Sequence, residues 1–222
     1  MQITLLCNAG LALEHENSVL LVDVLNGNTE PFCTLSNETW QEILNHTGSF
    51  ENICGLYFTH EHTDHCDRSK VEDYISRWNQ TPLFIPQESS IQGTLKMGPF
   101  VIHYARMDHA PMDVPTPPHV VTWISAGGKS VYLAADAKLD AEAHRRFLNG
   151  RKADIAFWNS MYLSQAATRQ LMKKAAQKNY IYHMPEDKPD HFGLWRKCEK
   201  NLQRYGTELD TVTVIDRYPY CL

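Results

Sequence analysis

The chain lacks most of the features that would place it in a specialised class of protein. Its six cysteines form no CxxC pair, which disfavours a disulfide framework and a cysteine-rich zinc site. No apolar run approaches the roughly 20 residues that span a bilayer. The first residues show neither the basic segment nor the longer apolar run of a secretory signal. We therefore expect reduced thiols and a cytoplasmic protein without a membrane partner.

Long runs of one charge are missing as well. The 21 Lys and Arg against 26 Asp and Glu give a formal charge of −5, and the two signs are interspersed. Nucleic acids and anionic membranes reward clustered positive charge. The composition therefore argues against both as partners.

What the chain does contain is a regular alternation of strand and helix patterns. Its 222 residues are enough to bury a sizeable core, and no linker or repeat divides them, so we expect one domain over residues 1–222. Short turns between the first three strands predict an antiparallel meander, and the later helices predict sheets covered by helices, an α/β fold. Strands are predicted at 2–6, 11–15, 19–24, 53–59, 100–106, 119–125, 130–135, 153–158, 180–183 and 211–216, and helices at 36–47, 71–78, 139–149, 164–178 and 191–205.

One segment, residues 59–67 (THEHTDHCD), concentrates imidazole and carboxylate groups at the end of an apolar strand. These are the ligands that zinc, iron and manganese accept. Because alternate residues of an extended segment point to the same side, His60 and His62 can face one position. The turn into the next helix can then aim Asp64 and His65 at a second position. The segment predicts a metal site, against the alternative of a charged, solvated turn.

The order of these residues resembles the HxHxDH signature of the metallo-β-lactamase superfamily. In that family the first two histidines bind one metal with a later histidine. The aspartate and last histidine of the motif bind a second metal with a final histidine, and another aspartate bridges the two. The resemblance, which spans about positions 1 to 190, implies a four-layer αββα sandwich with two divalent metal ions. We expect zinc, with manganese or iron as alternatives.

The remaining ligands implied by the resemblance are sought at the ends of later strand-like runs. His103 and His119 compete for the third histidine, but one lies within a strand and the other begins one. His191 competes for the last histidine, but it stands where a helix begins. The residues that match the family's order are His109, Asp136 and His183.

At three places the sequence differs from well-known members of this superfamily, and the differences indicate which branches it resembles less. The family usually has glycine before the bridging aspartate, where this chain has Ala135. Residues 66–69 (CDRS) replace the usual Gly-Gly, which is more similar to the branch with ascorbate-6-phosphate lactonases and N-acyl-phosphatidylethanolamine phospholipase D than to the true β-lactamases. His62 stands where the flavodiiron oxygen reductases have Glu, which disfavours redox di-iron chemistry.

The resemblance implies a metal-dependent hydrolase whose nucleophile is a metal-bound hydroxide. Asp64 is the expected catalytic residue, because it would orient this hydroxide and accept its proton, and Asp136 would bridge the metals. The expected substrate is a small molecule with an ester, lactone or phosphodiester bond. The alternatives are a phosphodiesterase or nuclease acting on nucleic acid, which would need a basic groove, and a non-catalytic metal-binding protein, which would be expected to lose a ligand.

Further roles around the expected site are assigned only from the positions of the residues in the sequence, close to the expected ligands or directly after a predicted strand. Carboxylates that could orient the ligand imidazoles are Glu61, Asp67 and Asp108, and Asp67 could equally cap the following helix. The expected rim of the pocket is the loops 86–99, 108–118 and 184–190. Candidate substrate contacts, against the alternative of solvated loops, are Asn159, Ser160, Tyr162, Glu186 and Lys188.

Overall fold

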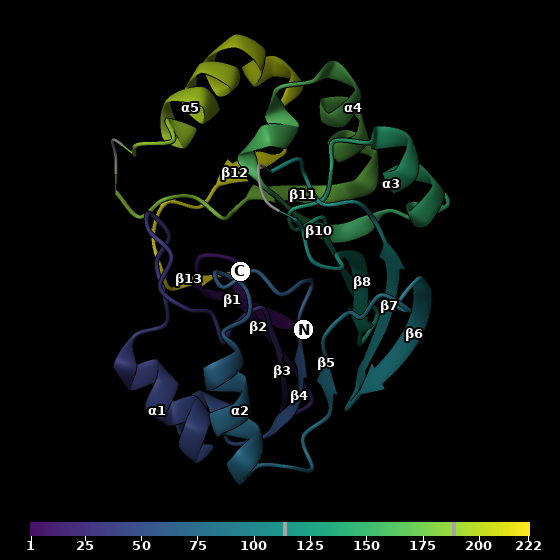
Figure 1. Cartoon of the computed structure of the whole chain (residues 1–222). Helices are drawn as coiled ribbons and strands as arrows, with labels where there is room; N and C mark the ends of the chain where they lie inside the picture. Colours follow the sequence, from purple (N-terminus) through teal and green to yellow (C-terminus); the bar gives the residue numbers. More distant parts are fainter. Residues whose placement is uncertain (113–114, 188–189) are drawn as a thin grey trace.

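Two mixed β-sheets form the centre of the computed structural model, which describes residues 1–112, 115–187 and 190–222 (Figure 1). The first sheet has the strand order β13-β1-β2-β3-β4-β5. Its strands are β1 (Gln2–Cys7), β2 (Gly10–His15), β3 (Ser18–Val22), β4 (Ile53–Tyr57), β5 (Leu83–Phe84) and β13 (Tyr220–Cys221). The first three strands run antiparallel, which confirms the predicted meander, and β3, β4 and β5 run parallel.

The second sheet has the strand order β12-β11-β10-β9-β8-β7-β6. Strands β6 to β9 are antiparallel neighbours, and β9 to β12 are parallel. Its strands are β6 (Gln92–Met97), β7 (Phe100–Arg106), β8 (Val120–Ala126), β9 (Lys129–Leu133), β10 (Ala153–Trp158), β11 (Ala176–Ile181) and β12 (Val212–Val214).

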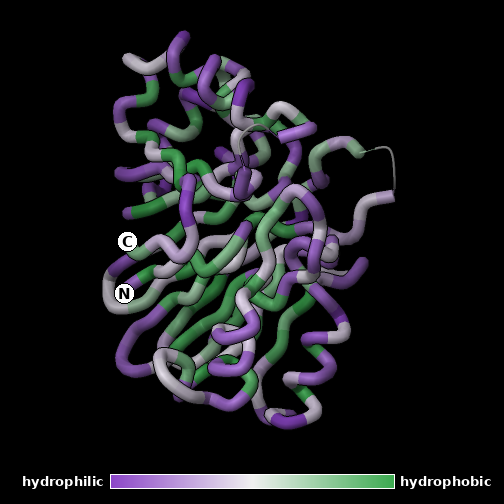
Figure 2. The backbone as a smooth tube through the Cα atoms, turned by 90° about the vertical axis from the view of Figure 1, so that its left-hand side faces the viewer, coloured by the Kyte–Doolittle hydropathy of each residue, from purple (hydrophilic) through white to green (hydrophobic). Residues whose placement is uncertain are grey.

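Central strands bury both of their faces, in two different hydrophobic cores. In β3, Leu20 joins the core between the two sheets, whereas Leu21 packs on the outer side of the first sheet. In β9, Leu133 joins the inner core and Tyr132 packs on the outer side of the second sheet. Because successive strand residues point to opposite faces, near-continuous apolar runs are what such strands require. Figure 2 shows these hydrophobic segments gathered in the middle of the molecule.

Helices cover the outer faces of both sheets (Figure 1). Buried residues of α1 and α2 join the core outside the first sheet, and those of α3, α4 and α5 join the core outside the second. The helices are α1 (Asn37–Asn45), α2 (Arg68–Arg77), α3 (Ala141–Leu148), α4 (Ala166–Ala175) and α5 (Leu194–Tyr205). The order helix, sheet, sheet, helix is the predicted αββα sandwich.

Two predicted segments differ from the structure. The predicted loop at 86–99 contains strand β6, an edge strand whose largely exposed residues show no apolar pattern. The predicted helix at 164–178 ends at Ala175, because Ala176 pairs with Ala153 and begins β11. Sheet pairing therefore overrides the helix propensity of the segment AAQK at 175–178. No residue of 86–99 lines the cavity described below, so the prediction that this segment belongs to the rim is wrong for that cavity.

No helix in the described part of the chain is long and apolar enough to cross a membrane.

Side chains in the inner core should contribute strongly to the stability of the fold. Leu20→Ala removes a fully buried side chain between the sheets, so we expect a loss of about 2–5 kcal/mol in the free energy of unfolding, measured by urea denaturation. The matched control is Leu83→Ala, whose side chain is 41% exposed and which should cost below about 1 kcal/mol. Equal losses in the two variants would contradict this assignment of the core.

Candidate metal centre

The predicted ligands leave the two sheets at a common edge. β4 runs directly into the segment 58–65, and β7, β9 and β11, which point the same way, lead to His109, Asp136 and His183. Two of these loops are also paired: the Ala110 N–H donates to the Asp136 carbonyl at 2.7 Å, and His109 forms an isolated bridge with Ala137. The topology therefore brings together residues that lie far apart in the sequence.

All seven predicted ligands lie close together, in two groups that share Asp136. Within each group the candidate ligand atoms lie within 4.8 Å of one another. The groups are His60, His62, His109 and Asp136, and Asp64, His65, Asp136 and His183. This is the same division into two positions that the resemblance implies.

One carboxylate oxygen of Asp136 lies between the two groups. Its Oδ2 atom lies 3.7 Å from Nε2 of His60 and 3.6 Å from Nε2 of His109. The same atom lies 3.3 Å from Nε2 of His65 and 3.4 Å from Nε2 of His183. A single oxygen at these distances from both groups is placed where a bridging ligand would be.

Four buried imidazole nitrogens have no hydrogen-bond partner in the described part of the chain: Nε2 of His60, His62, His65 and His109. A buried polar atom without a partner costs about 1–3 kcal/mol. Stability alone gives no reason to place four of them side by side. Imidazole nitrogen is the commonest metal ligand in proteins, so the residues present fit divalent metal ions such as zinc.

Asp23, a buried residue directly after β3, orients two of the candidate ligands. Its Oδ2 atom lies 3.0 Å from Nδ1 of His65 and also accepts the Thr59 hydroxyl at 2.6 Å. Because that hydroxyl donates to Asp23, its oxygen is left to accept from Nδ1 of His60, 3.1 Å away. With Nδ1 carrying the proton, Nε2 of each ring is free to bind a metal.

The loop that carries Asp136 is held by three buried side chains on three consecutive residues. Asn159 donates its amide to the Ala135 carbonyl at 3.0 Å, and Nε2 of His119 accepts the Asp136 N–H at 3.1 Å. The Tyr162 hydroxyl donates to the Ala137 carbonyl at 3.0 Å. The Asp136 carboxylate is thus positioned through its own backbone.

A second buried histidine supports this loop from behind. Nε2 of His144 lies 2.7 Å from the Tyr162 hydroxyl, and its Nδ1 bonds the Tyr132 hydroxyl. Burial lowers the pKa of His144 to about 4, so it is neutral at pH 7. The expectation that His144 is structural therefore agrees with its contacts.

The two groups differ in how they hold protons. Burial, followed by the neighbouring imidazoles, lowers the pKa of His60 well below its ordinary value, and burial also lowers that of His62. Burial opposes charge on His183 too, but the carboxylates of Asp136 and Asp64 outweigh it and raise its pKa to about 9. The same two carboxylates raise the pKa of His65 well above its ordinary value.

The competing histidines occupy other positions. His103 bonds the Thr94 hydroxyl on the exposed side of β7. The side chain of His191, which follows the 184–190 loop, is exposed. His119 lies beside the site, but Nδ1 faces the Met107 carbonyl at 3.2 Å and Nε2 accepts from Asp136. Neither of its nitrogens is free for a metal. In the sequence, His119 stands at the start of a strand, where a histidine of the core could equally stand. Its role beside the site could therefore not be predicted from the sequence.

The predicted orienting carboxylates have other partners. Asp67 caps α2 by accepting the Ser69 N–H at 2.9 Å, and Glu61 pairs with Arg68 at 2.5 Å. The prediction that Asp67 caps the helix is therefore confirmed. Among the described contacts, neither Asp67, Glu61 nor Asp108 bonds the ring of a candidate ligand, so the prediction that they orient ligands is wrong there. The residue missed is Asp23, whose signal was a lone carboxylate at the end of the apolar run 19–22.

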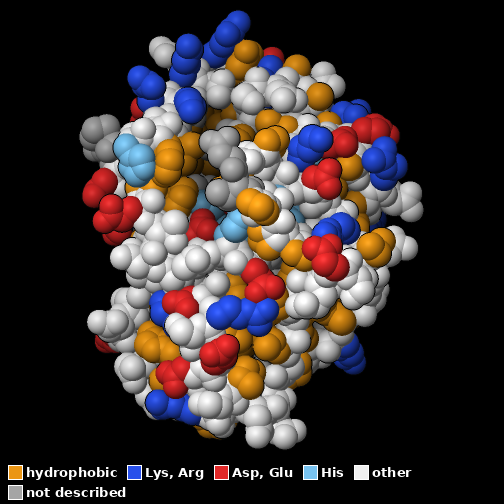
Figure 3. Space-filling model, in the orientation of Figure 1, with side chains coloured by type: hydrophobic (Ala, Val, Ile, Leu, Met, Phe, Trp, Pro, Cys, Tyr) orange, Lys and Arg blue, Asp and Glu red, His pale blue; other side chains and the backbone are white. Residues whose placement is uncertain are grey.

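A cavity of about 500 Å³ opens onto the candidate ligands. Of the predicted substrate contacts, Asn159 and Ser160 line it, whereas Tyr162 is buried behind it. Lys188 lies outside the described residues. In the space-filling view, histidine side chains are visible among hydrophobic ones in a hollow of this face (Figure 3).

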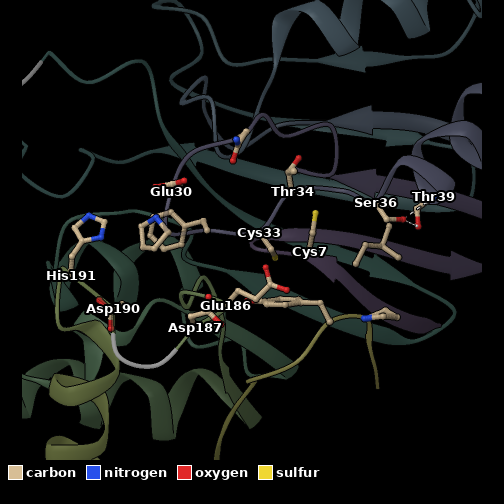
Figure 4. Close-up of a pocket in the computed structure, with 16 residues that line it drawn as sticks. Cys7, Glu30, Cys33, Thr34, Ser36, Thr39, Glu186, Asp187, Asp190 and His191 are labelled. Carbon is tan, nitrogen blue, oxygen red and sulfur yellow. Dashed lines mark hydrogen bonds between the residues drawn. The ribbon is translucent and has the colours of Figure 1, made fainter.

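A second cavity, of about 810 Å³, lies next to the first and shares Glu30 and Phe32 with it. Its wall is acidic and contains Glu186, Asp187 and Asp190, as Figure 4 shows. The loop that contains Glu30 and Phe32 lines both cavities, and it was not predicted to be part of the rim. The ring of Phe32 packs edge-on against the imidazole of the candidate ligand His183, at 4.4 Å between centroids.

Solved structures match the whole of this chain at low sequence identity. The metallo-β-lactamase fold protein YhfI from Bacillus subtilis matches with a TM-score of 0.63 and 15% identity, over 100% of this chain and 99% of that one. The chain has the metallo-β-lactamase fold. The fold is confirmed by this match together with the two facing sheets and their helices.

Two other solved structures that match this chain are named after different activities. An isothiocyanate hydrolase from Delia radicum gut bacteria matches with a TM-score of 0.64 and 13% identity, over 100% of this chain and 98% of that one. CmlA, a diiron β-hydroxylase from Streptomyces venezuelae, matches with a TM-score of 0.69 and 12% identity, and this chain spans 53% of its length. No protein-family model and no curated protein sequence matches the chain.

Metal binding should depend on pH differently in the two groups. Without metal, His65 and His183 hold protons at pH 7, and these must leave before a metal binds between Asp64 and Asp136. Affinity for that position should rise with pH up to about 9, by roughly tenfold per pH unit for each proton displaced. Binding at His60 and His62 should release few protons.

Zinc titration in weakly buffered solution measures the number of protons released as each equivalent of zinc binds. Equal release by both equivalents would contradict the assignment.

Tyr162→Phe should weaken metal binding without contacting the metal. It frees the Ala137 carbonyl and leaves Nε2 of His144 without its partner, so metal affinity should fall roughly tenfold or more. The matched control is Tyr57→Phe, which loses an equally buried hydrogen bond to Thr122 in the inner core. Both should destabilise the fold, but only Tyr162→Phe should change the zinc affinity measured by chelator competition. Equal affinities would show that the loop needs no such support.

Proposed function

We propose that this chain is a metal-dependent hydrolase that acts on an ester, lactone or phosphodiester bond of a small molecule. The observation that supports this most is the set of four buried Nε2 atoms around the shared Asp136 carboxylate, which have no hydrogen-bond partner among the described residues. Two of these histidines, His62 and His109, line the cavity together with Asp136. Two divalent ions, with zinc first among the candidates, fit these donors. When bound, such ions lower the pKa of a shared water and polarise a carbonyl or phosphoryl oxygen.

The protein's own residues would position this chemistry. Asp64 lines the cavity, and its Oδ2 atom lies 3.1 Å from Nε2 of His183. Burial opposes its charge, but the His65 and His183 charges outweigh it and lower the pKa of Asp64 to about 2, so it is ionised at neutral pH. An ionised carboxylate at this place can accept a hydrogen bond from the attacking water and take its proton. Asp136 is held in place by its loop and would fix the distance between the two positions.

The finer parts of the proposal come from the sequence. The segment CDRS at 66–69 supports the lactonase-like branch, and the dispersed charge supports a small-molecule substrate rather than a nucleic acid. A cytoplasmic location belongs to the same proposal. Because one of the matched structures is a diiron β-hydroxylase, metal analysis should include iron beside zinc and manganese.

Three isosteric variants test the roles of the carboxylates. Asp136→Asn removes the charge that both groups share, so bound metal should fall from about two ions per chain to one or fewer. Asp64→Asn keeps a possible oxygen ligand but cannot accept a proton, so the rate should fall by roughly two to four orders of magnitude with more metal retained. Glu61→Gln is the control, because Glu61 pairs with Arg68 and belongs to neither group.

The measurements are metal content by mass spectrometry and the rate of p-nitrophenyl ester and bis(p-nitrophenyl) phosphate hydrolysis before and after chelation. A chain that stays metal-free at saturating zinc, manganese and iron would disprove the proposal. Full activity in Asp64→Asn would remove the proposed proton acceptor, and unchanged metal content in Asp136→Asn would remove the bridge.

A further inference from the structure

Exposed hydrophobic side chains are concentrated at the candidate site. Six large hydrophobic residues are exposed in the described part of the chain, and three of them line the cavity over the candidate ligands. These three are Met112, Met161 and Phe192, with exposed fractions of 52%, 40% and 51%. Exposed apolar surface that is gathered at one place marks a binding site more often than scattered residues do.

The three residues belong to the apolar part of the cavity lining, called the apolar wall below. They come from separate segments, after β7, after β10 and before α5, and the same cavity is also lined by Phe32, Pro111 and Leu194. Figure 3 shows hydrophobic side chains around the hollow on this face. Loops that are distant in sequence thus present one apolar surface beside the candidate ligands.

Away from the candidate ligands, the described lining of this cavity offers no positively charged side chain. Its described lining residues include the carboxylates of Glu30, Asp64 and Asp136 and no Lys or Arg. Proteins hold the extra charge of a phosphodiester with arginine or lysine side chains, with backbone N–H groups or with metal ions. Because the described wall supplies no arginine or lysine beside the metal positions, it favours an uncharged group over an anionic one. The neighbouring cavity has Glu186, Asp187 and Asp190 in its described wall, so its side chains suit an anionic group no better.

We propose that the apolar wall binds the hydrophobic acyl group of an uncharged carboxylic ester or lactone, with the scissile carbonyl beside the candidate metal ligands. This inference rests on the proposed hydrolase function and selects one substrate class from it. The cavity volume of about 500 Å³ is in the range of pockets that enclose small ligands, about 300–1,000 Å³. Binding would cover side chains that are otherwise exposed to water.

A chain-length series tests the proposal with one leaving group. Zinc-loaded protein is assayed on the p-nitrophenyl esters of acetate, butyrate and hexanoate, with bis(p-nitrophenyl) phosphate as the anionic comparison. We expect kcat/KM to rise roughly twofold to fourfold for each added methylene. The hexanoate ester should also be cleaved faster than the phosphodiester.

Substitutions in the apolar wall test whether the dependence of kcat/KM on acyl chain length arises there. In Phe192→Ser and Met161→Ser, the ratio of kcat/KM for hexanoate to that for acetate should fall several-fold. The matched control is Ile91→Ser, which removes a side chain that is 62% exposed but lies outside the cavity, and it should keep the wild-type ratio. A wild-type ratio near one, a ratio unchanged by the wall variants, or faster cleavage of the phosphodiester would overturn the inference and leave the hydrolase proposal standing.

A binding measurement on the metal-free protein is independent of turnover. With methionine methyl groups labelled by carbon-13, titration with hexanamide should shift the signals of Met112 and Met161, while acetamide at equal concentration should not. The signals of Met97 and Met172, which are buried in the cores, serve as internal controls. If the metal-loaded protein cleaves neither the esters nor the phosphodiester, the proposed function fails, and this titration alone decides whether the wall binds apolar groups. Unshifted Met112 and Met161 signals would overturn the inference.

Discussion

The convergence of four imidazole nitrogens on one carboxylate oxygen is the constraint on which the site depends. Nε2 atoms of His60, His65, His109 and His183 lie within 3.7 Å of Oδ2 of Asp136. Buried lone pairs that point into the same space repel each other unless a cation or a proton lies between them. Without metal, burial and then the neighbouring imidazoles lower the pKa of His60, whereas for His65 burial is outweighed by the Asp136 and Asp64 carboxylates, which raise its pKa. The surrounding protein must therefore fix each ring and the carboxylate from behind.

That support includes unusual backbone conformations one or two residues after the ends of three strands. Asp23, Ala135 and His183 have φ angles of 53°, 46° and 57°, in the left-handed region. Each conformation costs roughly 1–2 kcal/mol for a residue other than glycine, and strain of this kind gathers at functional sites. At Ala135 it explains why the family usually has glycine there, and why alanine still fits: the Asn159 amide holds its carbonyl.

Sequence reasoning was most successful where a pattern is local. The motif at residues 60–65 and the strands with near-continuous apolar runs could be predicted, because each carries its signal within a few residues. The structure also places His109, Asp136 and His183 beside the motif, although their metal-binding role stays a prediction. The edge strand β6 carries too little apolar periodicity to predict. The end of α4 depends on pairing with a distant strand.

The parts of the site that could not be predicted are those that depend on tertiary contacts. Nothing near Asp23 in the sequence indicates that it would lie against His65, 42 residues later. The loop with Phe32 follows β3, and the segment 58–65 follows β4. Because β3 and β4 are parallel neighbours in the sheet, both segments leave it at the same edge, and Phe32 lines the cavity. Likewise, the apolar wall is assembled from loops whose individual sequences are unremarkable. Such contacts are visible only once the chain is folded.

The division of the ligands between the sheets has a mechanical consequence. Each group takes two residues from the segment after β4 in the first sheet and two from loops of the second sheet. An ion held by either group would therefore act as a cross-link between the two halves of the sandwich. A sliding of one sheet over the other by an ångström would break both groups at once. Occupancy of the site and cohesion of the inner core are thus thermodynamically linked, so that chelation would loosen the interface between the halves rather than a single loop.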